Sequence, residues 1–474
     1  MDPVEVNEPG VIFVLLRLVG VPLILGMALL RALGFRLASD RLGYLGWSWI
    51  GGALTTAFVL FVWLWFAVPA AWAIDVTLCG LAAGLFYLGR RVRFQPALIQ
   101  PETTAWEKRL FLGVVTFAFV VTALRLVMAT SEVIHRADEA TFWSLHGKVI
   151  FESGGFTSAY ASAAKSRFLL HGDYPLFNPL LHVWTYLHFD RITHVANRLP
   201  FLGFSMALIM ILASGLRRVR PAWVGAALLL IFMGCGQAII WTKRAHGDLF
   251  VGLGALLLLD GALRQQEAQD RSIWWRLSVL GACLCVWGKN EGMLVLVCTL
   301  VAILVRWLGA RGTDDSPTRS FHMGLLAPFF FVVLNRGFNA YFGHQSDVLT
   351  GEGAPLGEGI FTMLREHGSE RIPIVGGVLW SKALTVPEHS GFLILAFLTI
   401  VACVPFLVLR SKLGPSAVAL LLFQLGIFVV FLGTGRYLDK HLRTASARVL
   451  FQCMPALVLW LGVFCDHLHR RRCS

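Results

Sequence analysis

The chain has 474 residues, of which 57% are hydrophobic and 15% are charged, and its mean hydropathy is +0.69. These values exclude an ordinary soluble domain, because apolar runs of about twenty residues, the length of a membrane-spanning helix, recur along the chain. The formal net charge of +13 would suggest nucleic-acid binding in a soluble protein. In a membrane protein we attribute most of the basic residues to anchors that fix its topology, and we expect no nucleic-acid partner.

The apolar runs predict an all-α fold, a polytopic membrane bundle of about thirteen transmembrane helices. The expected spans are residues 11–30, 45–68, 72–89, 110–130, 199–216, 221–240, 248–263, 277–288, 292–308, 321–338, 391–409, 416–433 and 449–466. The segment 176–189 is short and polar, so we expect a half-helix that dips into the bundle. The nine cysteines lie almost entirely inside apolar runs, so we expect neither a disulfide framework nor a zinc site.

Lys and Arg residues gather in alternate gaps between the spans, which predicts the orientation of the bundle. The gaps that contain Arg217, Arg218 and Arg264, and the C-terminal Arg470 to Arg472, all fall on one side. The positive-inside rule places that side in the cytoplasm. The acidic N-terminus, which has no basic region typical of a cleaved signal peptide, and the loop at 131–198 then lie outside.

The loop at 131–198 is the first long polar segment and contains the first candidate site residues. An adjacent acidic pair, Asp138 and Glu139, follows the fourth span, and the sequence HGDYP supplies His171, Asp173 and Tyr174. Two carboxylates at the mouth of a helix bundle suggest acid-base chemistry. The alternatives are that the acidic pair caps the next helix and that HGDYP forms a turn.

Three turns on the outer side contain basic residues where the topology expects none. Ionisable groups near the membrane are costly and are usually retained for a partner or a site. The turns WTKRAHGD, WGKNEG and GRYLDKHLRTASARV contain five candidate phosphate-binding cations, Lys243, Arg244, Lys289, Arg443 and Arg448. Candidate substrate-binding residues are His171, Asp173, Tyr174, His246, Asp248, Asn290 and Glu291. The alternatives are a Lys289–Glu291 pair that neutralises itself and an Arg448 side chain that snorkels to the interface.

The order of these segments resembles the GT-C class of membrane glycosyltransferases, in particular the bacterial subset of the protein O-mannosyltransferase and lipid A aminoarabinose transferase branch. The resemblance covers residues 108–474 and implies a GT-C-like core with amphipathic helices in the first outer loop. Residues 1–107 form an additional three-helix membrane extension. HGDYP replaces the double-proline segment of the better-known branch, so the identity of the acceptor does not carry over.

The resemblance implies a polyprenyl-phosphate sugar donor, such as undecaprenyl phosphate sugar, and a glycan, lipid or protein acceptor. Asp138 matches the catalytic acidic residue of the first loop, Glu139 assists it, and the outer cations hold the donor phosphate. We expect an enzyme that transfers the sugar to an acceptor hydroxyl with inversion, on the outer face of a bacterial inner membrane in contact with its lipids.

Several alternatives stay open at the level of the sequence. A divalent metal is allowed by Asp138, Glu139, His171 and Asp173, but no spacing requires it, so the cofactor is unknown. Competing functions are a polysaccharide polymerase or ligase and a lipid-linked sugar flippase or transporter. A second outer segment, residues 335–390, contains glycines at 351, 353, 357 and 359 that predict irregular backbone, followed by an apolar piece at 372–384. It is either a flap over the site or a connector.

Overall fold

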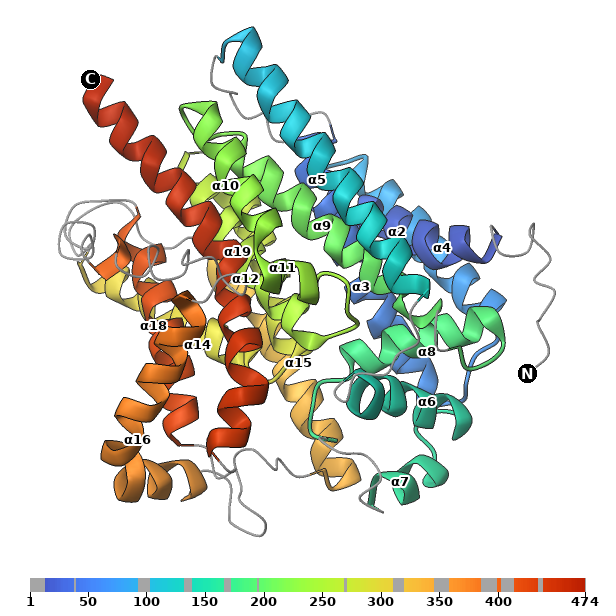
Figure 1. The fold of residues 1–474 in the computed structure, drawn as a ribbon. Helices are drawn as coiled ribbons and strands as arrows, with labels where there is room; N and C mark the ends of the chain where they lie inside the picture. The colour runs from blue at the N-terminus through green and yellow to red at the C-terminus, as the bar shows by residue number, and fades with distance from the viewer. Residues whose placement is uncertain are drawn as a thin grey trace.

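The computed structural model describes residues 13–37, 40–92, 103–131, 139–165, 172–193, 196–267, 271–309, 319–344, 358–384, 399–401, 413–433 and 438–473. Every regular element within these residues is a helix (Figure 1). The elements are η1 (Leu16–Gly20), α2 (Val21–Ala32), α3 (Arg41–Leu64), α4 (Ala71–Gly89), α5 (Ala105–Ser131), η2 (Glu139–Ser144), α6 (Leu145–Glu152), α7 (Ser158–Lys165), α8 (Phe177–Phe189), η3 (Ala196–Arg198), α9 (Leu199–Leu216), α10 (Ala222–Gly234), α11 (Gly236–Trp241), α12 (Gly247–Glu267), α13 (Arg271–Gly288), α14 (Gly292–Gly309), α15 (Arg319–Phe342), α16 (Glu358–Leu384), α18 (Gly414–Leu432) and α19 (Leu438–Cys473).

Eight helices of the described residues are long and apolar enough to cross a membrane. They are Phe13–Ala32, Arg41–Leu64, Ala71–Gly89, Ala105–Ala129, Ala196–Leu216, Gly324–Phe342, Gly414–Leu432 and Leu438–Arg472. Two shorter apolar helices occupy Ala222–Gly234 and Gly292–Val305. The prediction of an all-α membrane protein is therefore confirmed. The larger helix count and the GT-C-like core stay predictions, and most of the span expected at 391–409 lies outside the described residues.

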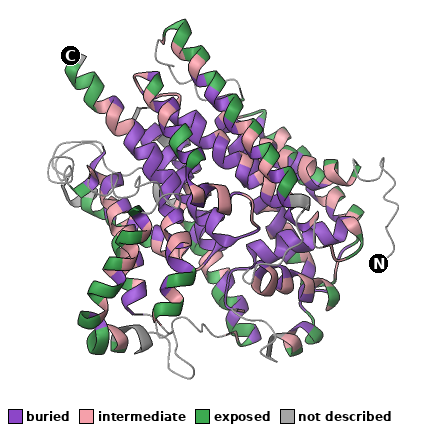
Figure 2. Cartoon of the chain, viewed as in Figure 1, coloured by how far each residue is buried: buried purple, intermediate pink, exposed green. Residues whose placement is uncertain are grey.

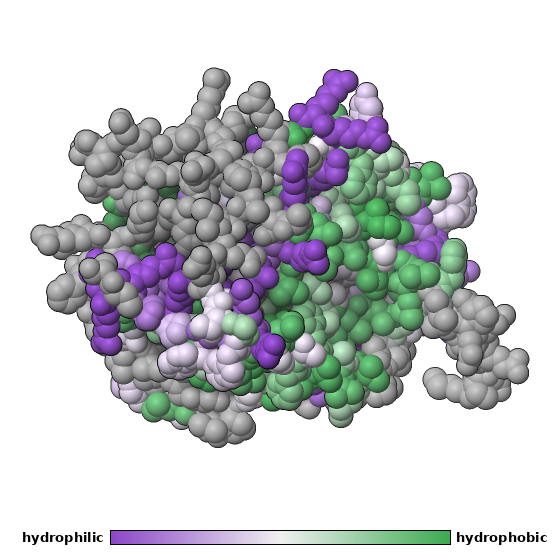
Figure 3. Space-filling model, turned by 90° about the horizontal axis from the view of Figure 1, so that it is seen from above, coloured by the Kyte–Doolittle hydropathy of each residue, from purple (hydrophilic) through white to green (hydrophobic). Residues whose placement is uncertain are grey.

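The bundle has two distinct ends, which we name after what they carry. The upper end in Figure 1 carries the starts of α5 and α10 and the C-terminal end of α19 with Arg470 to Arg472; we call it the Arg-rich end. The opposite end carries α6 and α7, and we call it the loop end. Seen from above the Arg-rich end, hydrophobic residues cover a broad part of the described surface on the right of the view, and hydrophilic residues gather on the left and at the upper edge (Figure 3).

The best-buried part of the bundle is formed by α12 and its neighbours α13, α19 and α9 (Figure 2). Small residues let α12 and α13 approach closely. A Cβ on Gly254 would lie 2.7 Å from the carbonyl oxygen of Gly281, and a Cβ on Gly281 would lie 2.6 Å from that of Gly254. Close approach through glycine is a common way to pack membrane helices, because apolar side chains gain little by leaving lipid for another helix. This contact holds α12 tightly against α13.

The short helix α8 enters the bundle as the sequence predicts for 176–189. All of its residues from Phe177 to His188 are buried, and it ends at Asp190, whose φ of 50° turns the chain back. The first helices of the chain pack against it. Trp184 of α8 donates a hydrogen bond to the carbonyl oxygen of Leu18 at 3.3 Å. The N-terminal helices are thus in direct contact with the segment that follows the first loop.

The second outer segment contains a longer helix than the sequence suggests. The apolar piece expected at 372–384 is the second half of α16, which begins at Glu358 and continues through Pro373. Ile372 and Trp380 keep 51% and 50% of their surface exposed. Such exposure on α16 suits a helix that lies against lipid. Of the four glycines predicted to give irregular backbone, Gly359 is the second residue of α16, so the prediction is wrong there, and those at 351, 353 and 357 lie outside the described residues.

Candidate functional site

Lys289 lies in the turn between α13 and α14 and forms the centre of a buried ionic cluster at the loop end. Its side chain is 1% exposed, and its Nζ lies 2.9 Å from Oδ1 of Asp248 and 2.8 Å from Oε1 of Glu291. The turn is tight, because a Cβ on Gly292 would lie 1.8 Å from the carbonyl oxygen of Cys285. The Lys289–Glu291 pair considered from the sequence is therefore present, but Asp248 joins it.

Asp248 lies in the first turn of α12, where the helix dipole favours a carboxylate, and it is fully buried. Besides Lys289, it accepts a hydrogen bond from Nε2 of Gln452 on α19 at 2.5 Å. Nδ1 of His246 lies 2.5 Å from its other oxygen. Three segments that are far apart in the sequence thus meet at one carboxylate.

The loop after α7 reaches the same cluster through Asp173 and Tyr174. Oδ2 of Asp173 accepts a hydrogen bond from Nδ2 of Asn290 at 2.8 Å, and its carbonyl oxygen accepts one from Asn339 at 2.8 Å. The ring of Tyr174 stacks on Trp143, with 5.1 Å between centroids and 9° between planes. Burial, reinforced by the nearby Glu291, raises the pKa of the Tyr174 phenol, so the ring remains a neutral donor.

The charges of the cluster explain the protonation state of Lys289. Burial alone would lower the pKa of its ammonium, but Asp248 and Glu291 raise it well above the ordinary value. The positive charge is therefore held by two carboxylates of the same cluster. In this arrangement Lys289 keeps Asp248 ionised and also pairs with Glu291, and its contact with a donor phosphate stays a prediction.

Glu139 is buried next to this cluster in a structural ion pair. Both of its carboxylate oxygens lie 2.9 Å from the guanidinium of Arg198, and Oε1 also accepts the backbone N–H of Ala245 at 2.9 Å. Burial would raise the pKa of Glu139, but the Arg198 hydrogen bonds and charge lower it. Glu139 therefore holds the turn at 242–246 in place. Asp138 and His171 lie outside the described residues.

The remaining candidate cations occupy different environments. Lys243 and Arg244 are half-buried in the turn after α11, and the Arg244 guanidinium lies 5.0 Å from the ring centroid of Trp241. Arg448 is half-buried on α19, one turn from Gln452. Arg443 is exposed and pairs with Asp439 at 2.6 Å. Lys243 and Arg244 thus lie within three residues of His246, and Arg448 lies within four residues of Gln452. Arg443 lies in the exposed first turns of α19.

Four residues of this region were not predicted from the sequence: Trp143, His182, Arg198 and Gln452. Arg198 precedes the span 199–216 at its outer end, so it breaks the same topological rule that identified the other outer cations. His182 on α8 is fully buried, and neither ring nitrogen has a hydrogen-bond partner among the described residues. Its ring lies 5.1 Å from that of Phe201. A histidine inside a predicted half-helix was the available signal.

The structure also bears on metal binding. Within the described ranges, no group of three or more His, Cys, Asp or Glu side chains is arranged to hold a metal ion. Two of the four side chains considered for a metal, Asp138 and His171, lie outside those ranges. Metal dependence therefore stays an open prediction.

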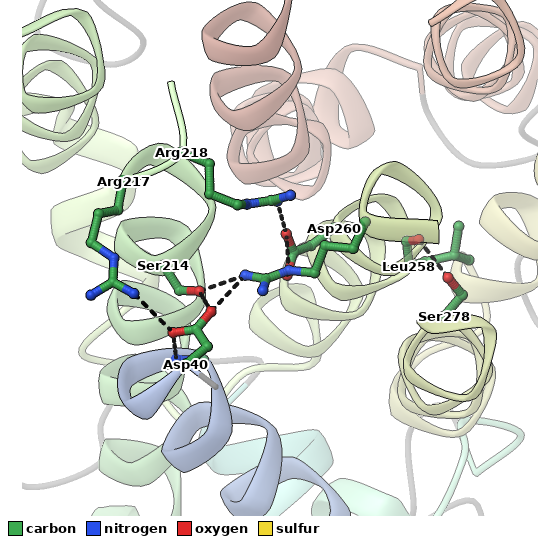
Figure 4. A network of polar contacts seen from close by, with 9 residues as sticks. Asp40, Ser214, Arg217, Arg218, Leu258, Asp260 and Ser278 are labelled. Carbon is green, nitrogen blue, oxygen red and sulfur yellow. Dashed lines mark hydrogen bonds and ion pairs between the residues drawn. The ribbon is translucent and has the colours of Figure 1, made fainter. Parts of the chain in front are cut away.

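A second buried ionic cluster lies at the Arg-rich end and joins α3, α9 and α12 (Figure 4). Arg264 is fully buried, and its Nε donates to both carboxylate oxygens of Asp260 at 2.9 and 2.8 Å. Its Nη2 lies 2.9 Å from Oδ2 of Asp40. The guanidinium lies 4.9 and 5.0 Å from the ring centroids of Trp47 and Trp274. Arg264 is one of the basic residues expected to anchor the topology, and its side chain is buried in ion pairs instead of exposed at the membrane surface.

Asp40 links this cluster to the start of α3. It caps the helix by accepting the N–H of Gly43 at 3.1 Å, and it accepts a hydrogen bond from Ser214 of α9. Arg218 adds a second cation to Asp260 at 2.6 Å. Each carboxylate of the cluster therefore has an Arg partner, so the charges compensate one another in a buried position.

Comparisons with protein-family models, with curated proteins and with solved structures give no match for this chain.

Proposed function

We propose that the protein is a glycosyltransferase that moves a sugar from a polyprenyl-phosphate donor to an acceptor hydroxyl. The observation that supports this most strongly is the buried cluster of Lys289, Asp248, Glu291 and Asp173 at the loop end. Burying so many charges is costly, and such costs are typical of catalytic sites. The cluster also joins the loop that carries the acidic pair to the two later turns, in the way the GT-C resemblance implies.

In this proposal the carboxylates of the cluster bind hydroxyl groups of the substrates. Oε1 of Glu291 is paired with Lys289, while Oε2 has no hydrogen-bond partner within the described residues. A carboxylate oxygen without a protein partner is an acceptor for a sugar or acceptor hydroxyl. Tyr174 supplies a neutral phenol beside it. Lys289 acts as a positioning residue that holds the other oxygen of Glu291 at 2.8 Å.

The reaction needs a base for the acceptor and cations for the leaving group. Asp138, by its match to the family position, takes the proton of the acceptor hydroxyl. The acceptor oxygen forms a bond to the anomeric carbon, and the bond from that carbon to the phosphate oxygen breaks with its electron pair. Polyprenyl phosphate leaves as a stable anion, held by Lys243 and Arg244, so no proton donor is required. Attack opposite the phosphate inverts the anomeric carbon.

The proposal includes the side of the membrane on which the site lies. Among the described residues, the start of α5, the turn before α10 with Arg217 and Arg218, and the C-terminal arginines of α19 lie at the opposite end from the cluster. The positive-inside rule then places the cluster on the periplasmic face of a bacterial inner membrane. A lipid-linked donor reaches such a site from the outer leaflet.

The test is sugar transfer by the purified protein in liposomes that contain a pool of polyprenyl-phosphate sugars, with a bacterial envelope extract as acceptor. Wild type should consume a donor and release polyprenyl phosphate. Asp138→Asn should abolish the transfer, because it removes the base. Glu291→Gln should lower the transfer by about tenfold or more, because a substrate hydrogen bond to a carboxylate contributes about 1.5–3 kcal/mol. Lys440→Gln is the matched control, because Lys440 is an exposed cation at the start of α19 that is not a candidate site residue.

Two results would contradict the proposal. The first is wild-type activity in the Asp138→Asn and Glu291→Gln variants. The second is a folded wild type that binds polyprenyl lipid by mass spectrometry but consumes no donor from the pool, which would favour a flippase or transporter. Loss of activity in Arg443→Gln alone would place the phosphate site at the start of α19 instead of the turn at 243–244.

A further inference from the structure

A shallow apolar hollow opens on the lipid-facing side of α5, where α5 lies beside α10. It measures about 350 Å³ and is lined by Arg109, Leu110, Gly113, Val114 and Phe117 of α5 and by Leu230 of α10. These α5 positions repeat every three or four residues, so they share one face of the helix. From Arg109 to Phe117 the hollow runs for about 12 Å along the helix axis. It therefore has the shape of a groove parallel to the membrane normal.

The groove is open to lipid and has room along its length. Phe117 and Leu230 keep 53% and 42% of their surface exposed, whereas Val114 at 8% forms the floor. A Cβ on Gly113 would meet no heavy atom within 4 Å. The glycine thus leaves a notch that nothing in the described chain fills. Its apolar walls match a hydrocarbon chain and no polar ligand.

Arg109 supplies a cation at the end of the groove that lies at the Arg-rich end of the bundle. Its side chain is exposed, and it has no hydrogen-bond or ion-pair partner within the described residues. The acidic residue closest to it in the chain, Glu107, is engaged elsewhere: one oxygen accepts from Thr104 at 3.0 Å and the other from the N–H of Ala222 at 3.2 Å. The positive charge of Arg109 is therefore available to an anionic ligand.

We propose that this groove binds one acyl chain of an anionic phospholipid, with the lipid phosphate at Arg109. A phosphate and a guanidinium form strong charge-assisted hydrogen bonds, and cations at this depth attract anionic headgroups. The apolar groove continues from that charge toward the membrane centre, as an acyl chain does. The groove lies at the Arg-rich end of α5, whereas the Lys289 cluster lies at the loop end. The lipid site is therefore independent of the proposed sugar transfer.

The experiment titrates the purified protein in detergent with phosphatidylglycerol and with zwitterionic phosphatidylethanolamine of the same chains, and counts bound lipids by native mass spectrometry. Wild type should retain one phosphatidylglycerol in preference to phosphatidylethanolamine. Arg109→Gln should reduce that preference by about fivefold, the factor expected for one cation near an anionic surface. Gly113→Leu should fill the notch and remove the bound lipid whatever its headgroup.

Matched controls separate the groove from general effects. Gly80→Leu on α4 also enters open space, and Lys108→Gln removes a neighbouring cation that does not line the groove. Both should behave like wild type, and unfolding temperatures should agree across the set. Equal binding in Gly113→Leu and wild type would overturn the proposal. So would an unchanged preference in Arg109→Gln, or displacement of phosphatidylglycerol by an equimolar amount of polyprenyl phosphate.

Discussion

Lys289 and Asp248 are 41 positions apart in the chain, yet the ammonium of one lies 2.9 Å from a carboxylate oxygen of the other in a fully buried position. The pair joins the start of α12 to the turn before α14. Its environment makes it sensitive to the loss of either partner, because a lone charge cannot recover its hydration there.

The first prediction concerns this pair. Lys289→Met should lower the free energy of unfolding by about 3–5 kcal/mol, because Asp248 and Glu291 would be left buried without a cation. Lys289→Arg should cost less, since it retains the charge. Thermal unfolding in detergent, followed by tryptophan fluorescence, gives the comparison. The exposed Arg443→Gln variant should change stability by less than about 1 kcal/mol, and an equal loss in both variants would contradict the argument.

The second prediction concerns the cluster at the Arg-rich end. Arg264→Gln should destabilise the fold strongly, because it removes the fully buried cation that Asp260 and Asp40 share. The double variant Arg264→Gln with Asp260→Asn should be more stable than the sum of the two single changes, by about 0.5–3 kcal/mol. A double-mutant cycle measured by unfolding checks this. Strict additivity would mean that the two side chains do not interact.

The third prediction concerns pH. His146 on α6 is 3% exposed, and burial, with a contribution from His344, lowers its pKa to about 3 from an ordinary 6.5. The folded state thus keeps His146 neutral, whereas the unfolded chain binds a proton below pH 6.5. This contribution to stability is complete above pH 6.5 and is lost as the pH falls from 6.5 toward 3, by up to about 1.4 kcal/mol per pH unit.

The measurement for His146 is the unfolding temperature between pH 7.5 and 4.5. Wild type should lose stability through this window, and His146→Gln should show a shallower slope, with its amide in place of the ring nitrogen that now lies 2.7 Å from the Tyr160 hydroxyl. His469, exposed near the C-terminus, is the control position. Parallel slopes for wild type and His146→Gln would refute the assignment.

The fourth prediction concerns the contact between α2 and α3. A Cβ on Gly52 would lie 1.7 Å from the carbonyl oxygen of Pro22, and a Cβ on Gly26 would lie 1.7 Å from that of Ser48. Gly52→Ala should therefore separate the two helices and lower the unfolding temperature. Gly80→Ala, where a Cβ meets nothing, should leave it unchanged or raise it slightly, because alanine favours a helix. The reverse order of the two variants would disprove this packing.

The sequence predicted the residues of the loop-end cluster better than it predicted their roles. The cost of ionisable groups beside apolar spans identifies the turns that contain His246, Asp248, Lys289, Asn290 and Glu291, and the HGDYP segment of the first polar loop supplies Asp173 and Tyr174. The structure brings these residues together. Which charges pair depends on side-chain distances across helices, and no periodicity encodes those. For this reason the sequence predicts neither the pairing of Lys289 with Asp248 nor that of Glu139 with Arg198.

The cluster at the Arg-rich end also contains pairs that the sequence pattern does not predict. Arg264 follows an apolar run, so the positive-inside rule counts it with the cytoplasmic anchors. That rule uses only the position of a residue in the sequence. The signal for burial was Asp260, an acid inside the same run and one helical turn before Arg264. An acid and a base on one helix face predict a pair, but only the packing of Trp47 and Trp274 around it decides that the pair is dry.

The contact between the first helices and α8 has a consequence for how this protein can be shortened. Asp75 of α4 lies 3.2 Å from Nε2 of His188 and 2.5 Å from Nη2 of Arg17, so a carboxylate of the first hundred residues is bonded directly to the half-helix. Removing those residues would leave His188 buried without its carboxylate partner and would expose one side of α8. The region that resembles a transferase core is therefore not a self-sufficient unit, and we expect it to fold only when the preceding helices are synthesised with it.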